Sequence, residues 1–375
     1  PMSVASVAGV LAIVLIMAIG MNFHPIYLTN NQWMVIVGIY IAIASVTPVW
    51  ILLQPRDYLS SFLLYAMLII AVVGVVGAHP AIEADLFPAF AGFAVTNEST
   101  GVTSYLFPVL FTTVACGAIS GFHSLVSSGT TSKQLDKETD AKPIAYGGML
   151  LECVLAVLTL CAIGYARKIG TTAGATDIFA GGIAGMVAAI PGLQDAQNVL
   201  YTLLVLTYSA FCLTSLDTAT RLARFMFQEF WLEPGQTVKD VDSGWKKTLV
   251  NPYVATVITV VIGIALGMTG YAKIWGLFGA ANQLLAGLGL LAVATWLGNI
   301  GRNNKMFLFP MAFMMVVTIC SLVLTVKDQL GLISAGGADW GPYAQVILAV
   351  LLIVLAVILV IEGIQTLTGK NTKNA

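Results

Sequence analysis

The chain has 375 residues, of which 58% are hydrophobic and 9% are charged, and its formal net charge is −1. Soluble domains carry about 25% charged residues, so this composition excludes a soluble core and indicates a membrane protein. The small net charge argues against a nucleic-acid partner. The five cysteines lie in apolar runs and form neither a zinc pattern nor a disulfide framework, so we expect no metal site and no cofactor.

Apolar runs of about 20 residues, the length that crosses a bilayer as a helix, recur along the chain. We predict an all-α polytopic membrane protein with about ten transmembrane helices. Their approximate positions are 3–22, 33–53, 58–78, 105–126, 144–166, 198–217, 252–270, 277–297, 306–326 and 343–366. The run 178–193 is too short to span with ease, and we expect a re-entrant or interfacial helix that ends at Pro191-Gly192.

The basic residues are distributed unevenly between the two sides of these predicted helices. If the first helix starts in the cytoplasm, most of the 17 Lys and Arg residues fall on the cytoplasmic side. The exceptions are Arg167, Lys168, Lys273 and Lys327. Because cytoplasmic loops carry an excess of Lys and Arg, this bias predicts a multi-pass plasma-membrane protein with both ends of this chain in the cytoplasm.

The second and third predicted helices are joined by the sequence Gln54-Pro55-Arg56-Asp57. Proline interrupts helices, and an acid suits the first turn of a helix. We therefore expect Pro55 to end one helix and Asp57 to cap the next. If this turn folds inward, Arg56 can bind a carboxylate.

Residues 112–135 fill an apolar run with Ser, Thr and Gly, which is unusual for a membrane helix. Four hydroxyl residues recur there at spacings that place them on one helical face. They are Ser120, Ser124, Ser127 and Thr131. In hydrocarbon such a face must contact protein, water or a solute, so we expect it to line a transport path. The same wall includes Gly121, His123, Ser128, Gly129 and Thr130.

Three polar residues within predicted helices, His123 among them, have two interpretations each. A lone His is usually a hydrogen-bonded packing residue, but among hydroxyls His123 also suits a solute or proton contact. Asn282 and Gln283 follow Gly276 and Gly279, which we expect to break the start of the eighth helix. Two amides inside a span can join helices or hold a solute, and both interpretations remain open.

Glu152 is the clearest acid within a predicted helix. A carboxylate there costs about 2.5–3.5 kcal/mol on insertion scales, so it needs a partner or a proton. One interpretation is a proton-coupling site, and the other is a paired or neutral Glu that faces a neighbouring helix. The first predicts that Glu152→Gln abolishes proton coupling.

The sixth predicted helix carries an acid, a base and two hydroxyls on one face. These residues are Thr214, Asp217, Thr218 and Arg221. Asp217 and Arg221 have the i, i+4 spacing of a helical ion pair. The four residues form either a coupling or gating network at the cytoplasmic mouth or an end-of-helix salt bridge that fixes the depth of the helix.

Four long segments of the chain resemble one protein family. They read VWILLQPRDYLSSFLL at 49–64, ACGAISGFHSLVSSGTTSKQL at 115–135, KPIAYGGMLLE at 142–152 and LTSLDTATRLARFMFQE at 213–229. The chain resembles the carbon starvation protein A (CstA) family of inner-membrane peptide transporters, some of which carry pyruvate. The resemblance implies a leucine-transporter-like fold of the amino acid–polyamine–organocation (APC) superfamily, with inverted repeats and broken helices. It also implies import driven by protons or another coupling ion, in the response to carbon starvation.

The resemblance also implies a division of the chain. Residues 1–166 correspond to the later part of the family's N-terminal transporter domain, and residues 167–375 to its C-terminal five-span domain. Family members begin with further spans, so we expect a fragment or a short relative.

No catalytic motif occurs, and we do not expect an enzyme. The alternative to a transporter is a membrane solute sensor or binding subunit that does not move its solute.

Overall fold

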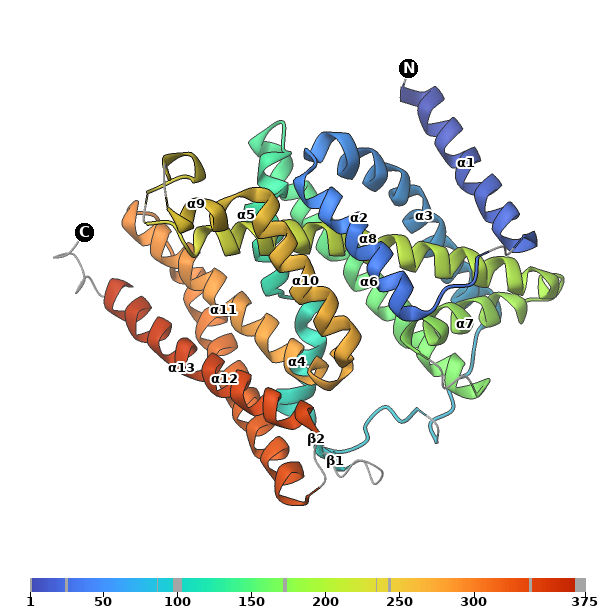
Figure 1. Cartoon of the computed structure of the whole chain (residues 1–375). Helices are drawn as coiled ribbons and strands as arrows, with labels where there is room; N and C mark the ends of the chain where they lie inside the picture. The colour runs from blue at the N-terminus through green and yellow to red at the C-terminus, as the bar shows by residue number, and fades with distance from the viewer. Residues whose placement is uncertain are drawn as a thin grey trace. The chain divides into compact units, whose positions relative to one another are not determined.

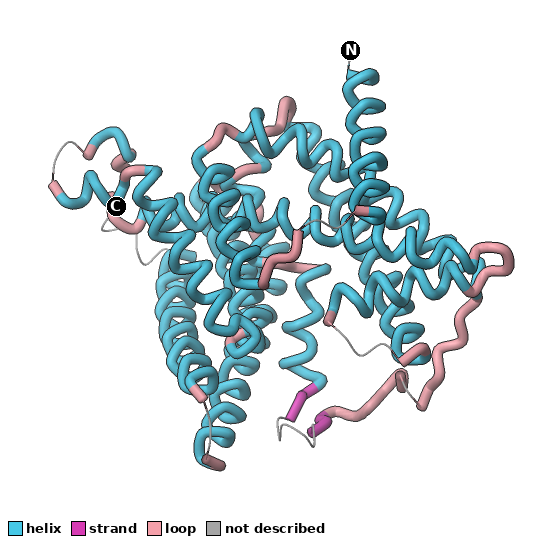
Figure 2. The backbone as a smooth tube through the Cα atoms, turned by 45° about the vertical axis from the view of Figure 1, so that its right-hand side comes forward, coloured by secondary structure: helices cyan, strands magenta, loops and turns pink. Residues whose placement is uncertain are grey.

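The computed structural model describes residues 2–23, 26–85, 87–96, 103–170, 174–233, 235–241, 244–336 and 339–367. Regular structure in these residues is helical, apart from one short antiparallel pair, β1 (Ala94–Thr96) and β2 (Thr103–Tyr105) (Figure 2). Within the described ranges, 9 helical segments are long and apolar enough to cross a membrane. The predicted helix 33–53 corresponds to α2 (Asn30–Val46), which is apolar and, with 17 residues, shorter than these 9 segments.

The chain divides into two compact units. Unit 1 contains Pro1–Ala89 and Leu150–Met268, and unit 2 contains Phe90–Met149 and Thr269–Ala375. Two helices, α6 (Ala141–Lys168) and α10 (Pro252–Gly270), cross a unit boundary in the sequence. The division into 1–166 and 167–375 rests on the family resemblance and stays a prediction.

Unit 1 has the short helix α7 (Ala175–Ala188) at its core. The side chains of Ile183 and Met186 are fully buried, and α3 (Val49–Ala78) and α8 (Gln197–Glu229) pack against this helix. At Gly182 an added Cβ would overlap the main chain of Ala162 on α6, so the glycine allows close helix packing. The other helices of unit 1 are α1 (Met2–Asn22), α2, α9 (Trp245–Val250) and most of α10. The sequence correctly predicts that α7 is short and ends before Pro191-Gly192, and its re-entrant or interfacial position stays a prediction.

The break between the second and third predicted helices lies at Thr47-Pro48, and the prediction of a break at Pro55 is wrong. A proline restricts the residue before it to extended conformations, and Thr47 has φ −72° and ψ 139°. The helix α2 therefore ends at Val46, and α3 begins at Val49. Pro55 lies inside α3 and removes only one backbone donor there. Asp57 lies inside the same helix, so its predicted role as a cap is also wrong.

Unit 2 contains three long helices that lie side by side (Figure 1). They are α11 (Trp275–Asn299), α12 (Lys305–Ser334) and α13 (Trp340–Leu367). A second hydrophobic core fills the space between them. Its buried members are Leu277, Ala280, Leu284, Met315, Leu322, Ala349 and Ala356.

Short 3₁₀ turns elsewhere in the described chain are Glu138–Asp140, Gln194–Ala196, Val238–Asp240 and Tyr271–Lys273.

The predicted helix 105–126 is interrupted in unit 2. A π-helical turn (Leu106–Leu110), α4 (Phe111–Val114) and a 3₁₀ turn (Ala115–Gly117) precede a break, after which α5 (Gly121–Gly129) begins. Ser120 lies in the break with extended backbone, φ −134° and ψ 132°. The predicted continuous helix is therefore wrong, and so is the predicted four-residue stripe, because only Ser124 and Ser127 lie within α5. Thr131 follows it in the 3₁₀ turn Thr131–Lys133.

An ion pair joins the turn before α11 to the start of α13. Lys273 pairs with Asp339, and Gln345 Nε2 donates to the Lys273 carbonyl over 2.6 Å. The hydrogen bond from Lys273 holds the pKa of Asp339 below its ordinary value, and a bond from the Gly341 N–H adds to this effect. The ion pair is therefore present at neutral pH and lost in acid.

We expect Asp339→Asn to lower the thermal midpoint of the protein at pH 7. A carboxylate with a depressed folded pKa stabilises the fold above its unfolded pKa of about 3.9, and this stability is lost as the pH falls through the folded pKa. The difference from wild type should therefore vanish in strong acid. Midpoints in detergent at neutral and acid pH measure this, with the exposed Asp136→Asn of the same unit as the control. An equal loss at both pH values would contradict the assignment.

Candidate functional site

Charged and hydroxyl side chains from α2, α3 and α8 meet inside unit 1. Asp217 of α8 is 0% exposed and forms an ion pair with Arg56 of α3. The hydroxyl of Tyr40, on α2, donates to the Asp217 Oδ2 atom over 3.0 Å. Arg56 Nη2 also lies 3.0 Å from Asp57 Oδ1, which accepts a 3.2 Å hydrogen bond from Thr214 Oγ1. We call these five residues the charged cluster.

The second carboxylate oxygen of Asp217, Oδ1, is buried and has no hydrogen-bond partner. A buried carboxylate oxygen is costly unless it is paired or protonated. The cluster therefore holds one oxygen of Asp217 firmly and leaves the other as a position that suits a proton or a polar group.

Arg221 does not pair with Asp217, so the ion pair predicted from their i, i+4 spacing is wrong. Its guanidinium donates instead to the carbonyls of Ala44, over 2.6 Å, and Thr47, over 2.7 Å. The usual helical donor to the Ala44 carbonyl would be residue 48, which is a proline without an N–H. Arg221 thus donates hydrogen bonds to carbonyl groups at the C-terminal end of α2. Asp217 forms its ion pair with Arg56 of α3 instead. Thr218 follows Asp217 on α8 and is half-buried.

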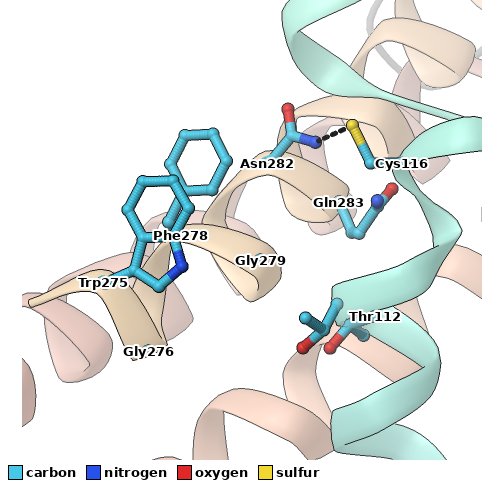
Figure 3. A pocket seen from close by; sticks show the side chains of 9 residues that line it. Thr112, Cys116, Trp275, Gly276, Phe278, Gly279, Asn282 and Gln283 are labelled. Atoms are coloured by element: carbon cyan, nitrogen blue, oxygen red, sulfur yellow. Dashed lines mark hydrogen bonds between the residues drawn. The ribbon is translucent and has the colours of Figure 1, made fainter. Parts of the chain in front are cut away.

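Asn282 of α11 holds the broken helix of unit 2. Its Oδ1 accepts from the Phe122 N–H over 2.8 Å, and its Nδ2 donates to Ser120 Oγ over 3.1 Å. The Nδ2 atom also donates to Cys116 Sγ over 3.6 Å (Figure 3). Gly121 lies so close to α11 that an added Cβ would overlap the Asn282 carbonyl. The polar atoms of this amide are therefore used in joining two helices, which is the packing interpretation.

The helix α11 is continuous from Trp275, so the predicted break at Gly276 and Gly279 is wrong. At Gly279 an added Cβ would lie 3.2 Å from the Thr113 Cα atom, so this glycine serves close packing against α4. A cavity of about 160 Å³ lies between α4 and α11. Gln283 and Trp275 are among the side chains that line it (Figure 3).

The other hydroxyls of residues 112–135 bond mainly to nearby carbonyls. Ser124 donates to Gly121, Ser127 to Ser124, Ser128 to Leu125 and Thr130 to Val126, over 2.7, 2.9, 3.2 and 2.9 Å. Such bonds satisfy a hydroxyl within its own helix. Gly129 ends α5, and Thr131 is half-buried after it. Their place in a transport path stays a prediction.

His123 is exposed on α5, and Glu152 is half-buried on α6. Neither takes part in the charged-cluster contacts given above. Tyr40, by contrast, belongs to that cluster and was not predicted. No signal in the sequence marks it, because only the packing of α2 on α8 brings its hydroxyl to Asp217.

The part of the chain that the structure describes has nine candidate spans and contains buried ionic and amide groups, which define a polytopic helical membrane protein. The family model described as carbon starvation protein CstA matches residues 1–169 and 162–321. The chain therefore belongs to the CstA family, which confirms the resemblance seen in its sequence.

Curated relatives match this chain over part of their length. The peptide transporter CstA of Bacillus subtilis (strain 168) is 32% identical over 316 residues, which cover 74% of this chain and 51% of the relative. The peptide transporter CstA of Escherichia coli (strain K12) is 33% identical over 362 residues, with 80% and 49% covered. The pyruvate/proton symporter BtsT of the same organism is 28% identical over 365 residues, with 76% and 49% covered. This chain thus spans about half the length of these relatives. No solved structure gives a significant match.

Proposed function

We propose that this chain belongs to a secondary active transporter that imports peptides or small carboxylates such as pyruvate across the inner membrane with protons. Its family and the transporter names of its relatives support this function. The observation that carries the proposal is the ion pair between Asp217, which is fully buried, and Arg56, which is partly buried. Ionisable residues within membrane helices are rare because they are costly, and they commonly mark ion and substrate paths.

In the proposed cycle Asp217 alternates between an ion pair with Arg56 and a protonated form. A proton at the unpartnered Oδ1 atom neutralises the carboxylate and weakens its hold on the guanidinium. Arg56 can then form paired hydrogen bonds with the carboxylate that both peptides and pyruvate present. Deprotonation restores the ion pair and displaces the substrate. Tyr40 and Asp57 keep Arg56 in place while its partner changes.

Uptake by vesicles that contain the purified chain tests the proposal. We expect labelled pyruvate or dipeptide to accumulate well above the level without a gradient when a proton gradient is imposed. Equal uptake under both conditions would reject proton coupling. Tight binding without accumulation would instead favour a solute sensor or binding subunit.

Glu152 and Asp217 are the two candidates for the coupling carboxylate, and their isosteric amides separate them. We expect Asp217→Asn to lose gradient-driven accumulation, because the amide cannot exchange a proton with the medium. If Glu152 is the coupling group instead, Glu152→Gln loses the pH dependence of uptake and Asp217→Asn keeps it. Both variants keep side-chain volume, which makes each the control of the other.

The proposal includes a leucine-transporter-like architecture of the APC superfamily and a role in the response to carbon starvation. The interrupted helix between Leu106 and Gly129 supports the architecture, because discontinuous helices form the binding sites of such transporters. The starvation role rests on the family name alone. Higher abundance of the protein in cells deprived of carbon source would support it, and constant abundance would contradict it.

The proposed orientation places the turn after α5 in the cytoplasm and the end of α12 outside. In a chain whose native cysteines are replaced, we expect Ser132→Cys to react with an impermeant thiol reagent only from the cytoplasmic side. Ser334→Cys should react only from the outside. Both residues are exposed, so a difference in labelling reports the side of the membrane on which each residue lies. Labelling of both from the same side would contradict the orientation.

A further inference from the structure

The C-terminal part of α8 carries a buried positive charge that the charged cluster does not use. Arg224 is only 7% exposed, and its guanidinium forms no hydrogen bond or ion pair with the residues that the structure describes. It lies over the ring of Phe225, 4.6 Å from the ring centre. The Nε atom is enclosed by protein, whereas the two Nη atoms at the tip of the side chain keep accessible surface. A ligand can therefore reach this tip.

The buried charges near Arg224 do not neutralise it. Arg221 lies one turn earlier on the same face of α8, and the electrostatic effect of its like charge reaches Arg224. Asp217, the buried acid of the same helix, forms its ion pair with Arg56. A buried charge without a counter-charge is costly, so an anion at the tip of Arg224 would stabilise the protein.

The acids that follow Arg224 in the sequence are exposed. Glu229 is the last residue of α8, and Glu233 lies 4.0 Å from Lys246 in the turn beyond it. Exposed carboxylates keep their water, and their attraction to a nearby cation is weak. An anionic ligand would therefore supply a counter-charge that these side chains do not.

The position of Arg224 along α8 places it near the lipid headgroups. The apolar run predicted at 198–217 ends seven residues earlier, so Arg224 lies about 10 Å further along the helix axis. The headgroup layer begins at the edge of the hydrocarbon core. Trp231, just after α8, contacts Trp245 of the adjoining α9 with ring centroids 5.3 Å apart. Trp is enriched at the level of the headgroups, so these rings support the same depth.

A phosphate group suits the chemistry of this site. The arginine guanidinium presents its N–H donors in a rigid planar fork that matches two phosphate oxygens. We propose that the tip of Arg224 binds a phosphate group, which the depth of the site assigns to the headgroup of an anionic lipid. This inference goes beyond the proposed transport function and does not depend on it.

Native mass spectrometry of the delipidated full chain in detergent measures this binding. The probes are phosphatidylglycerol and phosphatidylcholine with the same acyl chains, and inorganic phosphate competes with them in a third arm. We expect phosphatidylglycerol to bind at least about tenfold more tightly than phosphatidylcholine, roughly the effect of one charge-assisted hydrogen bond. Displacement of the lipid by inorganic phosphate would support the phosphate site and assign it to a soluble ligand. Equal binding of the two lipids without competition by phosphate would overturn the proposal.

Two variants with the same change of charge separate this site from a general attraction of anionic lipids to basic residues. Arg224→Gln should lower the affinity for phosphatidylglycerol about tenfold, to that for phosphatidylcholine. Arg302→Gln, at an exposed position, should leave the affinity unchanged. An unchanged lipid preference in Arg224→Gln, or an equal loss in Arg302→Gln, would overturn the proposal.

Thermal midpoints separate binding from folding. Arg224→Gln removes a buried charge without a counter-charge, so we expect no fall in the midpoint of the lipid-free protein. Phosphatidylglycerol should raise the midpoint of wild type more than that of this variant, because a ligand that binds the folded state stabilises it. Arg224→Lys keeps the charge but loses the fork, and it should bind with intermediate affinity. If Arg224→Gln does not fold, wild-type affinity in Arg224→Lys would contradict the proposed role of the guanidinium.

Discussion

Replacing Asp217 with Ala should lower the free energy of unfolding by about 3 kcal/mol, near the lower end of the range for breaking a buried ion pair. The substitution leaves the guanidinium of Arg56 without its buried counter-charge. Asp57 remains 3.0 Å from Arg56 but is partly exposed, so it compensates only in part. Unfolding with a denaturing detergent measures the change.

The matched control removes both charges. Arg56→Met combined with Asp217→Leu replaces the ion pair with apolar side chains, and such replacements are often neutral or stabilising. The double variant should therefore be more stable than Asp217→Ala. If its loss of stability equals or exceeds that of Asp217→Ala, the ion pair is not the source of the effect.

Replacing Gly121 with Ala should destabilise unit 2 by about 1–3 kcal/mol, the range for an overpacked core. An added Cβ would overlap the Asn282 carbonyl and lie 2.7 Å from the Ala286 backbone nitrogen, and neither backbone atom can move aside easily. The start of α5 would shift from α11 and weaken the hydrogen bond from the Phe122 N–H to Asn282. Because this contact holds the helix break, substrate uptake should fall as well.

Gly117→Ala is the control for this prediction. It adds the same methyl group before the break, where no atom outside the local helix lies within 4 Å. Thermal midpoints of the two variants in the same detergent should differ, with Gly117→Ala close to wild type. Equal midpoints would show that the contact between α5 and α11 is less tight than described.

The helices of this protein are predictable from its sequence because apolar runs of membrane-spanning length admit no other backbone structure in lipid. Their breaks are harder to predict. The predicted break lies at Pro55, whereas α2 ends before Pro48 and Pro55 lies within α3. The glycines show the same difficulty, because Gly279 serves close packing although its position suggests a break.

The ion-pair and hydrogen-bond partners within the candidate site were harder to predict than the residues that form it. Arg56, Asp57, Thr214 and Asp217 stand out in the sequence because polar groups are costly in membrane helices. Their pairing depends on three helices that are distant in the chain, so spacing along α8 wrongly favours Arg221 as the partner of Asp217. The two adjacent amides are similar. The sequence shows both within a predicted helix, and only the packing reveals that the side chain of Asn282 is hydrogen-bonded and that of Gln283 is not.

Substrate-driven proton entry tests the proposed coupling most directly. Vesicles that contain the chain and an internal pH dye receive pyruvate or a dipeptide outside, with no imposed gradient. The proposal predicts that the vesicle interior acidifies with wild type and does not with Asp217→Asn. No acidification with wild type, or equal acidification with Asp217→Asn, would contradict the account of Asp217 as the coupling group.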